Sequence, residues 1–147
     1  KAACHSRMCR QKKSPLKSPK PWPLAASHLP NVSARLGLSA TGIDVEAVAI
    51  RDAVRNAAYN QVTATFSTTP VDQIPGRFDL VLANLHAELL VALAGPLARL
   101  TGDRLITAGV LTDREDRVEA ALEQVGLVRE ARDQVGEWVS SVYRRRG

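Results

Sequence analysis

The stretch Phe78-Asp79-Leu80-Val81-Leu82-Ala83-Asn84-Leu85 decides the fold class. Its centre, from Leu80 to Ala83, is a short unbroken apolar run that an acid precedes and an amide ends. A run of this kind, bounded by polar residues, is typical of a strand buried on both faces. A helical pattern follows from Glu88 to Leu100. The alternation of strand and helix predicts a parallel sheet that helices cover.

Asn84 stands where this strand ends, and ligands of open α/β sheets bind outside the carboxyl ends of the strands. One interpretation makes Asn84 a turn residue or the cap of the next helix. The other makes it a side-chain amide that orients a substrate nitrogen or a cofactor. The amide alone favours the first, so the remaining sequence has to decide between them.

The composition is that of an ordinary globular domain. The 147 residues are 45% hydrophobic and 24% charged, which is enough for one domain with a core. No apolar run reaches the length of a membrane span, and no signal-peptide pattern is present. Two cysteines do not make a disulfide scaffold. We therefore expect a cytoplasmic protein.

The net charge of +5 is unevenly placed along the chain. Residues 1–31 hold seven Lys or Arg and no acid, so the remainder, with 13 basic and 15 acidic residues, carries −2. Proline, lysine and serine dominate residues 1–33, which predicts a disordered basic tail. Such a tail is either simply solvated or makes a weak contact with RNA.

A zinc site in this tail is the other possibility that its residue types raise. The candidate ligands are Cys4, His5, Cys9 and His28. Their spacing fits no standard pattern of zinc ligands. We therefore predict that the protein has no metal site.

The order of the expected elements predicts a doubly wound α/β sheet that ends in an antiparallel hairpin. Gly95-Pro96 should kink the second helix, and Thr112 with Glu115 has the spacing of a capping box for the third. The expected strands are residues 39–44, 62–66, 78–84, 104–110, 127–134 and 138–143, and the expected helices are residues 45–60, 88–100 and 112–125.

Asp44 is a second polar residue at the end of a predicted strand. An acid at the end of the second strand of a nucleotide-binding fold can accept hydrogen bonds from both ribose hydroxyls. A lone Asp in this place is more often the N-cap of the next helix. The combination of Asp44 with Asn84 indicates a nucleotide or cofactor site more specifically than either residue does alone.

From about residue 34 to residue 145 the chain resembles the ribosomal protein L11 methyltransferases (PrmA type), which have a Rossmann-like methyltransferase sheet. Both the content and the spacing of several blocks carry the resemblance. These blocks are Ala34-Arg35-Leu36-Gly37, Gly42-Ile43-Asp44-Val45-Glu46, Asn56-Ala57 with Asn60, the stretch Phe78 to Leu85, Leu97-Ala98-Arg99-Leu100, Arg104-Leu105-Ile106 with Gly109, and Gly136-Glu137-Trp138.

The resemblance implies an S-adenosylmethionine-dependent enzyme that methylates amino groups, the lysine side chains and N-terminal amine of a large-subunit ribosomal protein. It implies that Asp44 binds the adenosine ribose and that Asn84 lies by the cofactor and the entering amine. His86 either helps to deprotonate that amine or is simply a loop residue. An enzyme that methylates nucleic-acid bases is less well supported, because Leu85 and His86 follow Asn84 in place of Pro-Pro-aromatic.

The sequence also departs from the family. The glycine-rich loop after the first strand should precede Ala34, yet residues 27–33 there contain no glycine. We therefore expect residues 34–147 to be a partial methyltransferase domain whose first strand and glycine-rich loop are missing or degenerate. The family's N-terminal substrate-recognition domain is expected to be absent. The alternative function is that of an inactive remnant, or of a scaffold that binds the ribosome or RNA through its basic tail.

Overall fold

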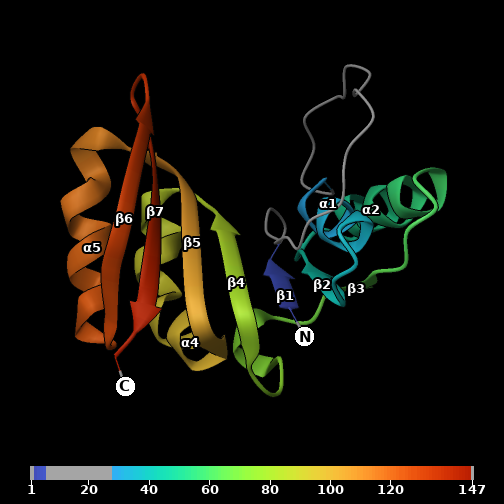
Figure 1. Ribbon diagram of the computed structural model, residues 1–147, viewed down its shortest axis with the longest axis horizontal. Coiled ribbons are helices and arrows are strands. Elements are labelled where there is room, and N and C mark those ends of the chain that lie inside the picture. The colour runs from blue at the N-terminus through green and yellow to red at the C-terminus, as the bar shows by residue number, and fades with distance from the viewer. Residues whose placement is uncertain (1, 6–27, 147) are drawn as a thin grey trace.

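The computed structural model describes residues 2–5 and 28–146. Within these residues the strands form one seven-stranded sheet with the order β3-β2-β1-β4-β5-β7-β6 (Figure 1). The first five strands in the chain pair in parallel, whereas β7 is antiparallel to both β5 and β6. The strands are β1 Ala2–His5, β2 Ala40–Ile43, β3 Thr65–Ser67, β4 Phe78–Asn84, β5 Thr101–Leu111, β6 Leu127–Val135 and β7 Trp138–Arg145.

Helices cover the two faces of this sheet. The helices are α1 His28–Arg35, α2 Ala47–Tyr59, α3 Ala87–Ala92, α4 Ala94–Leu100 and α5 Glu115–Gln124, with short 3₁₀ turns η1 Val71–Gln73 and η2 Thr112–Arg114. Gly42 of β2 faces α1, because a Cβ atom on it would lie 2.8 Å from the Pro30 side chain. Strand pairing across the sheet aligns Gly42 with Val142 of β7, so these two residues face the same side of the sheet. The next residue, Tyr143, points to the opposite face, where it lines a small space with Val118 of α5.

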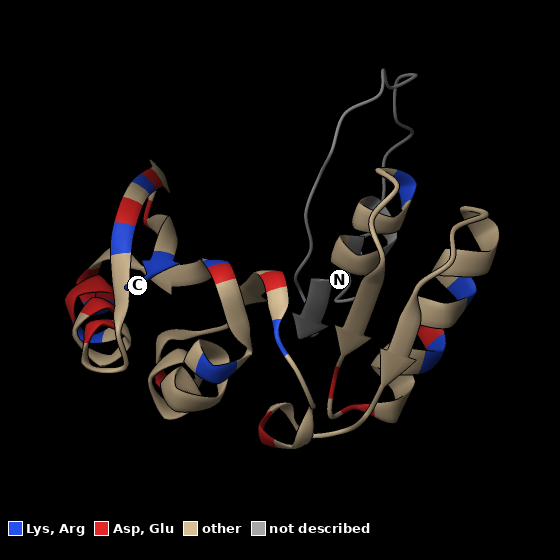
Figure 2. Cartoon of the chain, turned by 60° about the horizontal axis from the view of Figure 1, so that its bottom comes forward, with Lys and Arg blue, Asp and Glu red and all other residues tan. Residues whose placement is uncertain are grey.

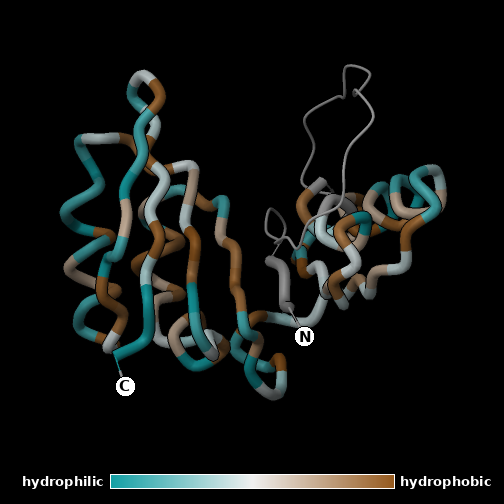
Figure 3. Tube along the Cα trace, viewed as in Figure 1, coloured by the Kyte–Doolittle hydropathy of each residue, from teal (hydrophilic) through white to brown (hydrophobic). Residues whose placement is uncertain are grey.

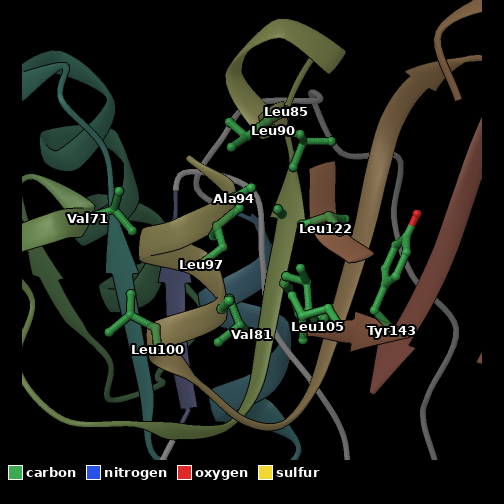
Figure 4. Close-up of a cluster of buried hydrophobic side chains, with 14 of the residues drawn as sticks. Val71, Val81, Leu85, Leu90, Ala94, Leu97, Leu100, Leu105, Leu122 and Tyr143 are labelled. Atoms are coloured by element: carbon green, nitrogen blue, oxygen red, sulfur yellow. The ribbon is translucent and has the colours of Figure 1, made fainter. Parts of the chain in front are cut away.

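The hydrophobic core lies between the sheet and helices α3, α4 and α5. Leu90, Leu97, Leu105 and Leu122 are fully buried, and Figure 4 shows the helix side chains meeting those of β4 and β5. Each such leucine contributes about 2 kcal/mol by leaving water. Apolar residues run along β4 in Figure 3, as expected of a strand whose successive residues are buried on both faces of the sheet. This core holds the carboxyl ends of β4 and β5 in place.

The N-terminal strand differs from what the sequence predicted. Residues 1–33 were expected to form a tail, but Ala2–His5 is β1 and lies between β2 and β4 in the middle of the sheet. Helix α1 also begins before the predicted boundary, at His28. The physical reason is that both neighbouring strands would otherwise present unpaired backbone groups. A four-residue strand thus stands where a missing or degenerate one was predicted, and residues 6–27 lie outside the described part of the chain.

The predicted break in the helix after β4 is confirmed. Helices α3 and α4 meet at Leu93, and Gly95 and Pro96 occupy the first turn of α4. Proline is tolerated in a first turn because the backbone N–H that it lacks would have no partner within the helix. The kink lets both short helices lay leucines on the sheet. Of the described helices, none is long and apolar enough to cross a membrane.

The third helix begins differently from the prediction. Thr112 to Arg114 form the turn η2, Glu115 is the first residue of α5, and no side chain caps this helix. The capping-box prediction is therefore wrong. The reason is that the Glu115 carboxylate pairs instead with Arg129 and Arg132 of β6.

The C-terminal hairpin of β6 and β7 is confirmed, with Gly136 at φ +60° in its turn. Figure 2 shows acidic and basic residues interspersed at this end of the sheet, where α5 carries four acids. Glu130 of β6 forms ion pairs with both Arg104 of β5 and Arg144 of β7. Charges along an edge strand discourage pairing with a second molecule.

Candidate functional site

The two site residues predicted from the sequence lie on one edge of the sheet. His5 of β1 is in register with Ile43 of β2 and with Ala83 of β4. Asp44 and Asn84 each follow directly, so they stand at the same level at the carboxyl ends of their strands. They are two strand spacings apart, roughly 10 Å along the hydrogen-bonding direction. β1 ends between them.

Asp44 is half-buried and fixed by two backbone contacts. Its N–H donates to the Ser67 carbonyl oxygen at 3.2 Å, and its Oδ1 accepts from the Glu46 N–H at 3.0 Å. It is not the N-cap of α2, because that position belongs to Glu46, which makes no side-chain cap. Its other carboxylate oxygen, Oδ2, makes no hydrogen bond to the described residues. Asp44 therefore offers one oriented carboxylate oxygen at the edge of the sheet.

Asp44 also lines a cavity beneath α2. The cavity has a volume of about 10 Å³, which is room for roughly one water molecule. The other lining residues are Pro30, Gly42, Ile43, Ala49, Ile50, Ala53 and Phe66. A nucleoside needs a much larger site, of at least about 300 Å³. The described residues thus supply side chains for one wall of such a site and do not enclose it.

Asn84 ends β4 and lies against β5. A Cβ atom on Gly109 would stand 2.5 Å from Asn84 Oδ1, so the amide occupies the space that a side chain there would fill. Backbone pairing continues beyond it, since Leu85 N–H donates to the Ala108 carbonyl oxygen at 3.0 Å. The N-cap of α3 is His86. Asn84 is therefore not a helix cap, and its amide is held at the edge of the sheet.

A chain of charged contacts follows Asn84. The Nδ1 atom of His86 lies 3.0 Å from Glu88 Oε2, and Arg114 of η2 donates to Glu88 Oε1 at 3.2 Å. Arg114 also donates to Asp113 at 3.1 Å. The pKa of Glu88 is lowered, first by a backbone N–H donated to its carboxylate and then by the hydrogen bond with His86. These contacts join the turn after β4 to the turn after β5.

Sequence reasoning missed two parts of this edge. Ser67 ends β3 beside Asp44, and Thr69 follows two residues later. Their hydroxyls are 2.6 Å apart, and the Thr69 N–H donates to Ser67 Oγ. Gly109 sits at a register shift in β5. A polar run after β-branched residues and a lone glycine inside a predicted strand were the available signals.

The metal prediction concerns residues that are only partly described. Within residues 2–5 and 28–146, no group of His, Cys, Asp and Glu is arranged to hold a metal ion. Of the zinc candidates weighed from the sequence, Cys9 lies outside these ranges. The side chains of Cys4, His5 and His28 are likewise not described.

Asp44 and Asn84 thus stand at the carboxyl edge of a parallel part of the sheet, and sequence comparison assigns the family. The sequence model of "Ribosomal protein L11 methyltransferase (PrmA)" matches residues 29–146. The chain belongs to this family. The match begins within α1 and runs through β7, so it contains both Asp44 and Asn84.

Curated relatives agree with this assignment. The chain is 44% identical over 108 residues to the ribosomal protein L11 methyltransferase of Geobacter sulfurreducens, covering 72% of this chain and 36% of the relative. It is 43% identical over 117 residues to that of Pelobacter propionicus, covering 76% and 38%. The chain therefore matches little more than a third of the length of these relatives.

Solved structures show the same fold, the class I S-adenosylmethionine-dependent methyltransferase fold. The ribosomal protein L11 methylase of Lactobacillus delbrueckii subsp. bulgaricus superposes with a TM-score of 0.77 at 24% identity, covering 80% of this chain and 64% of that one. Magnesium protoporphyrin IX methyltransferase of Synechocystis, solved with bound S-adenosylmethionine, gives 0.70 at 19% identity with the same coverage. At these identities the likeness concerns the fold alone.

Proposed function

We propose that this chain transfers methyl groups from S-adenosylmethionine to amino groups of a large-subunit ribosomal protein, on lysine side chains and the N-terminal amine. The observation that carries the proposal is the strand register that brings Asp44 and Asn84 to one edge of the sheet. Family membership supplies the reaction class. The register places the two proposed groups at the same level of one edge, on either side of the end of β1.

Asp44 would hold the cofactor, and Asn84 would position the entering amine beside it. The free carboxylate oxygen of Asp44 would accept a hydrogen bond from a ribose hydroxyl, as an acid does at the end of a strand in nucleotide-binding folds. Asn84 Oδ1 would accept one from the N–H of the entering amine and so aim the nitrogen lone pair. When bound, S-adenosylmethionine supplies a methyl group carried on a positively charged sulfur. The chain contributes mainly positioning and exclusion of water.

The second candidate is an inactive relative that keeps the fold. The observation that favours it is that this sequence has no glycine before Gly37, although the family's glycine-rich loop would fall between β1 and α1. Backbone without side chains lets that kind of loop approach a cofactor closely. The alternative of a scaffold that binds RNA through a basic tail has no support from the described residues. All seven basic residues of 1–31 lie outside them.

The experiment is transfer of labelled methyl groups to proteins of the isolated large ribosomal subunit. We expect labelling of one ribosomal protein on amino groups, with loss of at least about tenfold in rate for Asn84→Ala and for Asp44→Ala. Asp52→Ala is the matched control, since Asp52 is an exposed acid on α2 that pairs only weakly with Arg55, at 3.7 Å. A folded chain that labels no protein would favour the inactive relative.

A further inference from the structure

His86 is an imidazole at the carboxyl edge of the sheet that the proposed function does not yet use. It stands two residues beyond Asn84, at the N-cap of α3, and its side chain is 64% exposed. Its Nδ1 atom lies 3.0 Å from Glu88 Oε2. An ionised carboxylate only accepts hydrogen bonds, so in the neutral ring Nδ1 carries the hydrogen and Nε2 keeps a lone pair.

Glu88 is well placed to hold this tautomer. Its pKa is lowered, so it remains ionised to lower pH than an ordinary glutamate. Arg114 fixes its other oxygen at 3.2 Å, and Asp113 in turn contacts Arg114 at 3.1 Å. The described charged groups that face His86 are thus Glu88 on its own helix, with Arg114 and Asp113 behind it on η2. A histidine oriented by a carboxylate is a recurrent arrangement for accepting a proton.

The same two chain segments also position Asn84. The turn after β4 contacts the end of β5 in two ways. Asn84 packs against Gly109, and the Leu85 N–H donates a hydrogen bond to the Ala108 carbonyl oxygen. It reaches η2, the next segment, through Glu88 and Arg114. His86 and Asn84 therefore belong to one short turn that is anchored at both ends on the segment 108–114.

We propose that Nε2 of His86 accepts the proton of the substrate ammonium group; this inference rests on the proposed function. An N–H bond of the ammonium breaks, its electron pair stays on nitrogen, and the proton moves to Nε2. The neutral nitrogen then forms the new N–C bond while the C–S bond breaks with its electron pair to sulfur. The proton passes from His86 to water, so each transfer releases one proton.

The first test needs neither cofactor nor substrate. Nitrogen NMR of the chain labelled at its three histidines, with His86→Asn to assign the signal, reports which ring nitrogen carries hydrogen. We expect hydrogen on Nδ1 of His86 in the neutral ring, and loss of that preference in Glu88→Ala. Hydrogen on Nε2 in the unmodified chain would overturn the proposal.

The second test is the pH dependence of methyl transfer. A lysine amine has a pKa near 10.4, so without an internal acceptor the rate should rise steadily with pH as free amine forms. We expect His86→Asn to be about 10- to 100-fold slower than the unmodified chain at pH 7 and within about twofold at pH 10. A purely structural role would give the same ratio at both pH values, which would overturn the inference.

The role of His86 and the proposed function can be disproved separately. Calorimetric titration should give equal cofactor affinity for His86→Asn and the unmodified chain. If the unmodified chain transfers methyl groups and the ratio is constant, the role of His86 is wrong and the proposed function stands. If the unmodified chain transfers none at any pH, both are wrong.

Discussion

The Oδ1 atom of Asn84 lies 2.5 Å from the point that a Cβ atom on Gly109 would occupy. Gly109 has φ +80°, a conformation that side-chain-bearing residues rarely adopt, and it sits at a register shift between Thr107 and Val110 of β5. Gly109 therefore allows the bulge in β5 and leaves room for the Asn84 amide. The position of Asn84 on β4 thus depends on a glycine on the neighbouring strand.

Gly109→Ala should disturb both the backbone and Asn84. We expect a loss of about 2–4 kcal/mol in the free energy of unfolding, because the new methyl group meets Asn84 and the backbone is strained. Gly126→Ala is the matched control, since Gly126 has φ +85° with no atom within 4 Å of its Cβ position. Urea unfolding of both variants measures the difference. Equal losses would mean that contact with Asn84 contributes nothing.

The Glu115 cluster should make stability depend on pH. The Glu115 side chain is 11% exposed and pairs with Arg129 and Arg132, whose hydrogen bonds hold its pKa below the ordinary 4.5. The stabilisation is fully present above pH 4.5 and is lost as pH falls through the lower value of the folded state. Glu115→Gln should cost about 2 kcal/mol at pH 7 and flatten the loss of stability below pH 4.5.

The control for this change lies on the same helix. Glu123 of α5 is exposed and forms no ion pair with the described residues. Glu123→Gln should leave the free energy of unfolding within about 0.5 kcal/mol of the original at every pH. Denaturant titrations at pH 7, 5 and 3 compare the two variants. The cluster would have no stabilising role if both variants followed the same curve.

Replacing Ser33 should not lower the free energy of unfolding, in contrast to the substitutions of Gly109 and Glu115. Its side chain on α1 is fully buried, and its hydroxyl has no hydrogen-bond partner among the described residues. Ser33→Ala removes that unpaired group and places a better helix former in α1, so stability should stay equal or rise by about 1 kcal/mol.

Ser141 on β7 provides the contrast to Ser33. It is also buried, and it neighbours Tyr143: burial raises the pKa of Tyr143, and the Ser141 hydroxyl acts against that shift. Ser141→Ala should therefore destabilise the chain by about 1 kcal/mol, because the buried Tyr143 hydroxyl loses a polar neighbour. Thermal unfolding of the two variants and of the original chain compares their stabilities. A Ser33→Ala chain that melts well below the original would show that the hydroxyl has a partner after all.

The sequence predicts the parts of the fold that local patterns determine. The apolar run from Leu80 to Ala83 is β4, the break at Gly95-Pro96 is present, and Gly136 turns the hairpin. The placement of Asp44 and Asn84 at strand ends was also correct. Their roles remain predictions. These successes share one cause, since the hydrophobic period and the turn residues are local signals.

The failures have a cause that is not local. Ala2–His5 carries no distinctive strand pattern, and it is a strand because β2 and β4 offer it hydrogen bonds on both sides. Glu115 has the spacing of a cap, but Arg129 and Arg132 arrive from β6, 14 and 17 residues later. In each case a tertiary partner decides between two locally acceptable structures.

Calorimetric titration of the purified chain with S-adenosylmethionine, with Asp44→Ala alongside, is the most direct test of the proposed function. Circular dichroism first establishes that both proteins are folded. The account predicts micromolar binding by the unmodified chain and loss of binding in Asp44→Ala. A folded chain that does not bind, or an Asp44→Ala variant that binds equally well, would contradict the assignment of this edge as the cofactor site.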